Sequence, residues 1–117
     1  MFSALFDELH RTVPGLKAVF VVGDDGIEVG GTRFEELPHE VLSAEMSGLL
    51  KTLKRLREEI ALGAPRDLAI RTDAEILLLC PLQEGLSILL VAGEGTPTGL
   101  ARYQVQRLAH RFQEALK

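Results

Sequence analysis

The 117-residue sequence has little of what metal sites, disulfide frameworks and aromatic cores require. It has a single cysteine, Cys80, so no internal disulfide can form, which fits a reducing cytoplasm. Its three histidines lie far apart and never in an HxxxH or HExxH spacing, so no metal site is expected. Tryptophan is absent and aromatic residues make up 5% of the chain, which predicts a mostly aliphatic core.

Charge and hydropathy narrow the class of partner. The formal net charge is −4, without the basic excess of a nucleic-acid-binding domain. No stretch approaches the ~20 apolar residues that a membrane span requires. The first residues, MFSALFDELHR, carry two carboxylates and no long apolar run, unlike a signal peptide. We therefore expect one cytoplasmic domain over residues 1–117, with neither nucleic acid nor a membrane span.

Signals for catalysis are equally sparse. Cys80 ends the apolar run ILLLC, where a reactive thiolate would be disfavoured, and Ser87 has no evident base in its pattern. GEGTPTG at residues 93–99 is neither a P-loop nor a dinucleotide fingerprint, so a strand-to-helix turn is the main interpretation and an anion site the alternative. GDDG at residues 23–26 has too few ligands for calcium and indicates a tight turn. We expect no enzyme activity, cofactor or metal.

The longest periodic stretch runs from Pro38 to Leu62 without an internal proline. Pro38 suits a first helical position, while Gly63 and then Pro65 provide a left-handed stop. Apolar residues recur at steps of four and three, which predicts a helix whose apolar stripe is buried on a sheet. The stripe comprises Leu42, Met46, Leu49, Leu53, Leu56 and Ile60, widened by Leu50.

The opposite side of this helix carries Lys51, Arg55 and Glu58, a mixed-charge face suited to a protein partner. Small residues surround its first two turns, so a second helix could approach there. A helix that only covers its own core is the alternative. The small residues are Ser43, Ala44, Ser47 and Gly48.

The remaining elements follow from periodicity and turn residues. The predicted order is α-β-β-α-β-β-β-α. A short helix covers residues 2–12, strands cover 16–22, 27–30, 67–71, 75–80 and 86–92, and a last helix ends near residue 116.

The expected burial of each strand then predicts an α+β fold with a single order of strands in the sheet. Short connections make neighbouring strands antiparallel. The strands at 18–22, 76–80 and 86–92 are apolar at nearly every position and belong in the middle, whereas those at 27–30 and 67–71 resemble edges. The predicted order is 2-1-5-4-3, with the central helix on one face and the terminal helices on the other.

The edge at residues 67–71 predicts self-association. Two such edges joined about a two-fold axis would continue the sheet and bring the central helices together. Antiparallel pairing about Ala69 would set Asp67 opposite the partner's Arg71, and Leu50 would be shared between the core and the partner helix. We therefore expect a homodimer.

The whole pattern resembles the roadblock family, small domains related to a dynein light chain and to bacterial regulators of Ras-like GTPases. The resemblance rests on the opening helix ending near Val13-Pro14-Gly15, the segment LKAVFVVGDDGIEVGG, the long central helix, and the meander DLAIRTDAEILLLCPLQEGLSILLVA. It implies a non-catalytic dimer that regulates or scaffolds a small Ras-like GTPase, with its dimer contact on the central helix and third strand. With Asp67 from the edge argument, the expected interface is Ser43, Ser47, Leu50, Lys54, Asp67, Leu68, Ala69, Ile70 and Arg71; Lys51, Arg55 and Glu58 are the expected partner-binding residues.

A small-molecule sensor of the profilin-like or PAS-like kind is the alternative function, since such domains also place helices around an antiparallel sheet. A sensor needs a cavity with convergent polar groups, and the central strands offer only Ser87 and Cys80.

Overall fold

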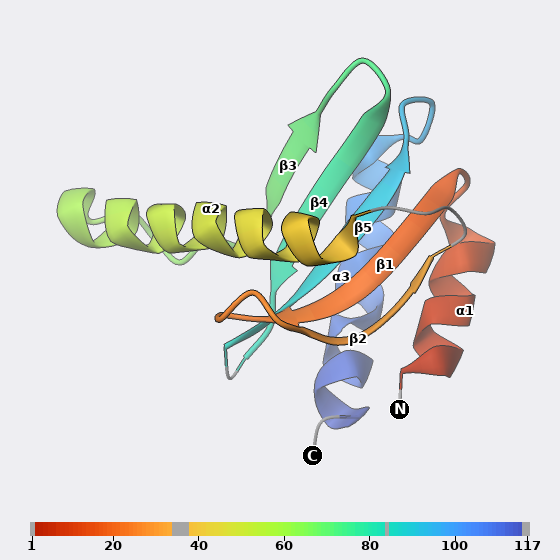
Figure 1. The fold of residues 1–117 in the computed structure, drawn as a ribbon, viewed down its shortest axis with the longest axis horizontal. Coiled ribbons are helices and arrows are strands. Elements are labelled where there is room, and N and C mark those ends of the chain that lie inside the picture. The colour runs from red at the N-terminus through yellow and green to blue at the C-terminus, as the bar shows by residue number, and fades with distance from the viewer. Residues whose placement is uncertain (1, 34–37, 84, 116–117) are drawn as a thin grey trace.

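The computed structural model describes residues 2–33, 38–83 and 85–115. It contains the eight predicted elements in the predicted order (Figure 1). Their bounds are α1 Ser3–Thr12, β1 Leu16–Gly23, β2 Glu28–Arg33, α2 His39–Ile60, β3 Leu68–Arg71, β4 Glu75–Pro81, β5 Leu86–Gly93 and α3 Thr98–Ala115.

The five strands form one sheet in the order β2-β1-β5-β4-β3, which confirms the predicted order. Every neighbouring pair is antiparallel. Helix α2 lies across one face, while α1 and α3 lie side by side on the other (Figure 1). The central strands are therefore covered on both faces, as their apolar sequences require.

The layer under α1 and α3 is the larger of two cores. Phe2, Phe6 and Phe112 meet there with ring centroids 5.7 to 5.8 Å apart. Such aromatic pairs add about 0.5–1.5 kcal/mol to the free energy of burial. The predicted inward face of α1, with Leu5 and Leu9, is confirmed.

An ionic cluster joins the same two helices at the surface. Glu8 of α1 accepts a hydrogen bond from Arg107 Nη2 at 2.6 Å and another from Arg111 Nη1 at 2.9 Å. These two guanidinium groups hold the pKa of the Glu8 carboxyl below its usual value. The cluster spans about a hundred positions of sequence, so local charge patterning could not reveal it.

The segment at residues 93–99 is part of the packing between the first and last helices. Thr96 Oγ1 donates to the carbonyl of Pro14 at 2.6 Å, and the amide of Gly93 donates to the carbonyl of Gly15 at 3.0 Å. Gly15 has φ +77°, and a Cβ there would lie 2.7 Å from Thr96 Oγ1. The strand-to-helix turn, rather than an anion site, accounts for these residues.

Two expectations for α2 were wrong. The helix leaves the helical path at Ala61, with φ 56° and its amide bonded to Arg57, so Gly63 is not the left-handed stop. The apolar stripe is also not the buried face: Leu49, Leu56 and Ile60 are 42%, 39% and 57% exposed. Leu42 and Leu53 are half-buried. The buried residues are Ser43, Met46, Ser47 and Leu50.

The reason for the second error lies in the geometry of the helix. The buried residues are spaced i, i+3, i+4 and i+7, which defines one helix face. At 3.6 residues per turn, the predicted stripe is rotated from that face by about 90°. The helix thus contacts the sheet through two small serines and two apolar side chains. Most of its leucines are sideways, at about 90° around the helix from the face that meets the sheet.

The aromatic cluster yields a stability prediction. Phe112→Ala should lower the free energy of unfolding by about 3–5 kcal/mol, because the side chain is fully buried and contacts both Phe2 and Phe6. Tyr103→Ala on the same helix should cost less than about 0.5 kcal/mol, because Tyr103 is 60% exposed. Urea unfolding of both variants measures the difference; equal losses would contradict the assignment of helix faces.

The Glu8 cluster yields a pH prediction. A carboxyl whose pKa is lowered by folding contributes stability above its unfolded pKa, and that contribution is lost as pH falls through the folded pKa. Glu8→Gln should therefore lower the melting temperature at pH 7, and its deficit should shrink as the pH falls below the ordinary value of 4.5. Glu45→Gln, on an exposed part of α2, is the matched control. A deficit independent of pH would refute the electrostatic role of Glu8.

Candidate functional site

The N-terminal half of α2 is fixed to the sheet by close contacts. Ser47 Oγ donates to the carbonyl of Gly23 at 3.1 Å, where the predicted GDDG turn joins β1 to β2. Gly26 in that turn has φ +82°, and a Cβ there would lie 3.1 Å from the Cα of Ala44. Helix and turn therefore approach with almost no side chain between them.

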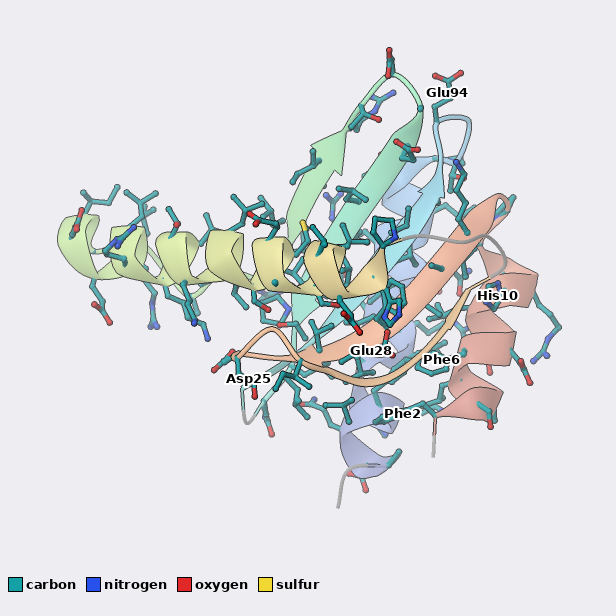
Figure 2. The ribbon with its side chains drawn as sticks, in the orientation of Figure 1. Phe2, Phe6, His10, Asp25, Glu28 and Glu94 are labelled. Atoms are coloured by element: carbon teal, nitrogen blue, oxygen red, sulfur yellow. The ribbon has the colours of Figure 1, made fainter. Side chains whose placement is uncertain are left out.

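The first turn of α2 has a second attachment. His39 Nδ1 lies 3.1 Å from Glu28 Oε1, and its ring stacks on Phe20 with centroids 6.0 Å apart. Figure 2 shows Glu28 beneath the start of the helix. The pairing joins residues eleven positions apart, across the β2–α2 connection, and the sequence pattern gave no signal for it.

The C-terminal half of α2 projects beyond the sheet. From Lys51 to Ile60, every side chain is exposed except the half-buried Leu53. Figure 1 shows the helix crossing the strands and continuing past the β3 edge. The described strands therefore leave most of this half of the helix uncovered.

An uncovered apolar surface results beside β3. The strand register places Leu68 and Ile70 of β3 on the α2 side of the sheet, where they are half-buried with Leu77. The sideways leucines of α2 lie along the same side. We define the α2–β3 surface as Leu49, Leu53, Leu56 and Ile60 of α2 with Leu68, Ile70 and Leu77.

The expected interface residues divide into two groups. Ser43, Ser47 and Leu50 are buried within their own chain, and their expected contact with a second helix stays a prediction. The small size of the two serines allows close packing on the sheet. Residues 68–71 form the open edge as expected.

Two of the expected interface charges are bound within the chain. Asp67 Oδ2 accepts from Arg102 Nε at 3.0 Å, and Lys54 Nζ lies 3.4 Å from Asp24 Oδ1. Both partners are distant in sequence, which is why local spacing missed them.

The expected partner-binding residues Lys51, Arg55 and Glu58 are all exposed. Their spacing of four and three places them on one face of the overhanging half of α2. Glu58 and Lys54 also border a cavity of about 440 Å³ that reaches the β4–β5 turn and α3. The structure thus presents mixed charge on a helix held at its other end.

The described residues give no support for a reactive cysteine, a metal site or a membrane-spanning helix. Burial raises the pKa of the Cys80 thiol to about 12, so this sulfur is a packing group. In the described part of the chain, no three His, Cys, Asp or Glu side chains come together to hold a metal ion. None of the described helices has the length and apolar content that crossing a membrane requires.

The fold and site together define a small α+β domain with one open sheet edge beside an overhanging helix. The model of the Roadblock/LC7 domain matches residues 2–92. The chain belongs to this family, which confirms the resemblance drawn from the sequence. Among curated proteins, no sequence matches significantly.

Solved structures share the fold at low sequence identity. A Roadblock/LC7 domain from Streptomyces avermitilis is 17% identical with a TM-score of 0.85, over 94% of this chain and 92% of that one. Myxococcus xanthus MglB is 15% identical with a TM-score of 0.86, over 97% and 92%. An MglB with a tetrameric arrangement is 14% identical with a TM-score of 0.83, over 92% and 81%.

Proposed function

We propose that this chain is a non-catalytic, homodimeric regulatory module whose paired α2 helices bind a small Ras-like GTPase in the cytoplasm. The observation that carries the proposal is the α2–β3 surface, which is apolar and uncovered although it adjoins the core. Membership of the Roadblock/LC7 family supports an interaction module. The MglB with a tetrameric arrangement supports self-association within this fold.

The overhang of α2 has the right length for a second sheet. Ten residues beyond Leu50 extend about 15 Å at 1.5 Å per residue. Strands are spaced by about 4.8 Å, so the overhang would cover about three strands of a sheet continued past β3. A two-fold axis at the β3 edge supplies those strands from the partner, and the overhangs of both chains are then buried.

Apolar burial, rather than ion pairs, would hold this dimer together. Asp67 is already bound by Arg102, so an additional pair with the partner's Arg71 would contribute little. Leu56 and Ile60 would lose their exposure to water, at about 25 cal/mol for each Å² of apolar surface.

The GTPase would meet the outer face of the paired helices. Lys51 and Arg55 remain exposed there and would not be consumed by the dimer contact. Arginine is enriched at the centres of protein interfaces, and charges at the rim accelerate association. The proposed role is binding and regulation or scaffolding, without a cofactor.

The proposed dimer is tested by measuring the mass of the protein in solution and by introducing charged residues into the overhanging half of α2. Light scattering at micromolar concentration should give about twice the chain mass of 12.8 kDa. Leu56→Glu combined with Ile60→Glu should produce monomers, because two carboxylates would be buried in an apolar interface.

Val41→Glu is the matched control, an exposed apolar residue of the same helix outside the α2–β3 surface. It should remain dimeric. A wild-type monomer at this concentration, or a dimer that survives the double substitution, would refute the proposed interface.

The proposed GTPase partner is tested by titrating this protein with each Ras-like GTPase of the source organism, in both nucleotide states. One of them should bind, and Lys51→Glu with Arg55→Glu should weaken binding mainly by slowing association, with the dimer intact. Arg11→Glu, on α1 across the sheet, should have no such effect.

Two outcomes would count against the GTPase. One is an absence of binding to every GTPase tested; the other is equal weakening by the α1 control. If no GTPase binds while a small metabolite raises the melting temperature, the domain is a small-molecule sensor instead.

A further inference from the structure

The other edge of the sheet, at β2, has a different character from β3. Strand β2 ends the sheet beside β1, so part of its backbone N–H and C=O groups point away from any neighbouring strand. The register shifts between Val21 and Val22, leaving Val29 without a partner residue in a bulge. Val29 is 53% exposed, and Ile27 just before the strand is 64% exposed. This edge is both open and apolar.

Two surface cavities join along this edge. One of about 440 Å³ lies between α1 and β2 and is lined by Phe2, Phe6 and Asp7 with residues 29–31. The other, of about 390 Å³, lies between the β1–β2 and β4–β5 turns. Val29 lines both, so the two cavities adjoin at this residue. We call the pair the β2 groove; Figure 2 shows Phe2 and Phe6 near its α1 end and Asp25 at the other.

Consecutive glycines give the groove its floor. A Cβ on Gly30 would lie 3.1 Å from the ring of Phe2, and one on Gly31 would lie 2.5 Å from the ring of Phe20. Two glycines weaken a strand, and they commonly mark close approach of another group to the backbone. Here aromatic rings occupy both sides of the backbone, with Phe2 in the core under α1 and Phe20 in the core under α2.

Among the described residues, the charged side chains that line the β2 groove are carboxylates. They are Asp7 at the α1 end and Asp24 and Asp25 at the turn end. Asp25 accepts from the amide of Ile27 at 3.0 Å, so it is held in place. A cationic ligand is favoured at both ends, with an apolar group between them.

We infer that the β2 groove binds an extended, basic segment of another protein, which adds as a strand beside β2. Backbone hydrogen bonds to the edge would supply affinity. An apolar side chain would enter the cavity at Phe2 and Phe6, while Lys or Arg side chains would meet Asp7 and the Asp24–Asp25 turn. A second copy of β2 is a poor occupant, because it offers Gly30 and Gly31 where an apolar anchor is needed.

This site is separate from the proposed dimer edge. It lies at the opposite edge of the sheet from β3, with three strands between them, although its turn end lies near α2, where Asp24 pairs with Lys54. Both edges can therefore be occupied at once, and the test of the dimer does not decide the test of the groove.

The test is selection of a random twelve-residue peptide library against the whole purified chain. Enriched peptides should alternate apolar residues with Lys or Arg, and should shift the backbone amide resonances of residues 27–31. Asp7→Lys, and separately Asp25→Lys, should each lower the affinity of the best peptide at least about tenfold. Each substitution removes one favourable charge contact and adds a repulsion.

Asp73→Lys is the charge-matched control, since Asp73 is exposed in the β3–β4 turn. It should leave peptide affinity unchanged, and melting temperatures should show that all three variants fold. Enrichment of acidic or unpatterned peptides, shifts at β3 instead of β2, or equal affinities across the variants would overturn the inference. A lower mass of the free protein after the substitution Val29→Lys would also overturn the inference, because the occupant of the groove would then be a second copy of this chain.

Discussion

Three strands that are apolar on both faces impose the constraint on which the rest of the structure depends. Strands β1, β4 and β5 each need cover above and below. On one face α1 and α3 supply it fully, joined by the phenylalanine cluster and by Glu8 with its two arginines. On the other face α2 alone must cover the sheet, and it crosses the strands instead of lying along them (Figure 1). The unequal cover leaves the apolar surface beside β3.

The way α2 rests on the sheet explains how a leucine-rich helix can leave leucines exposed. Ser43 and Ser47 allow the helix backbone to approach the β1–β2 turn, and Ser47 gains a hydrogen bond there. Leucines on that face would have held the helix away from the turn. Close contact at one end therefore rotates the apolar stripe sideways, toward β3, and the stripe then extends past the edge.

The sequence was sufficient for the fold because local periodicity, turn residues and burial all agreed. Strand order followed from two properties of the sequence: short connections identified hairpin partners, and the strands that are apolar at nearly every position belonged in the middle. The contacts of α2 did not follow, since a period of 3.6 shows that one face is apolar but not which face meets the sheet. Ser43 and Ser47 illustrate this limit: small residues serve close packing within a chain as well as between chains. Pairs such as Asp67 with Arg102, and His39 with Glu28, depend on tertiary placement that no spacing encodes.

The two edges of the sheet differ in what they can accept. Strand β3 carries half-buried apolar side chains and adjoins a helix that continues past the sheet edge, a shape that a second copy would complement in the proposed dimer. Strand β2 has glycines in its middle, a bulge at Val29 and carboxylates around it, so its own sequence does not complement it. In the proposed dimer, β3 would pair with the same strand of a second copy. The β2 edge of each chain would then lie at an outer end of the joined sheet, where the proposed peptide segment could bind at the same time.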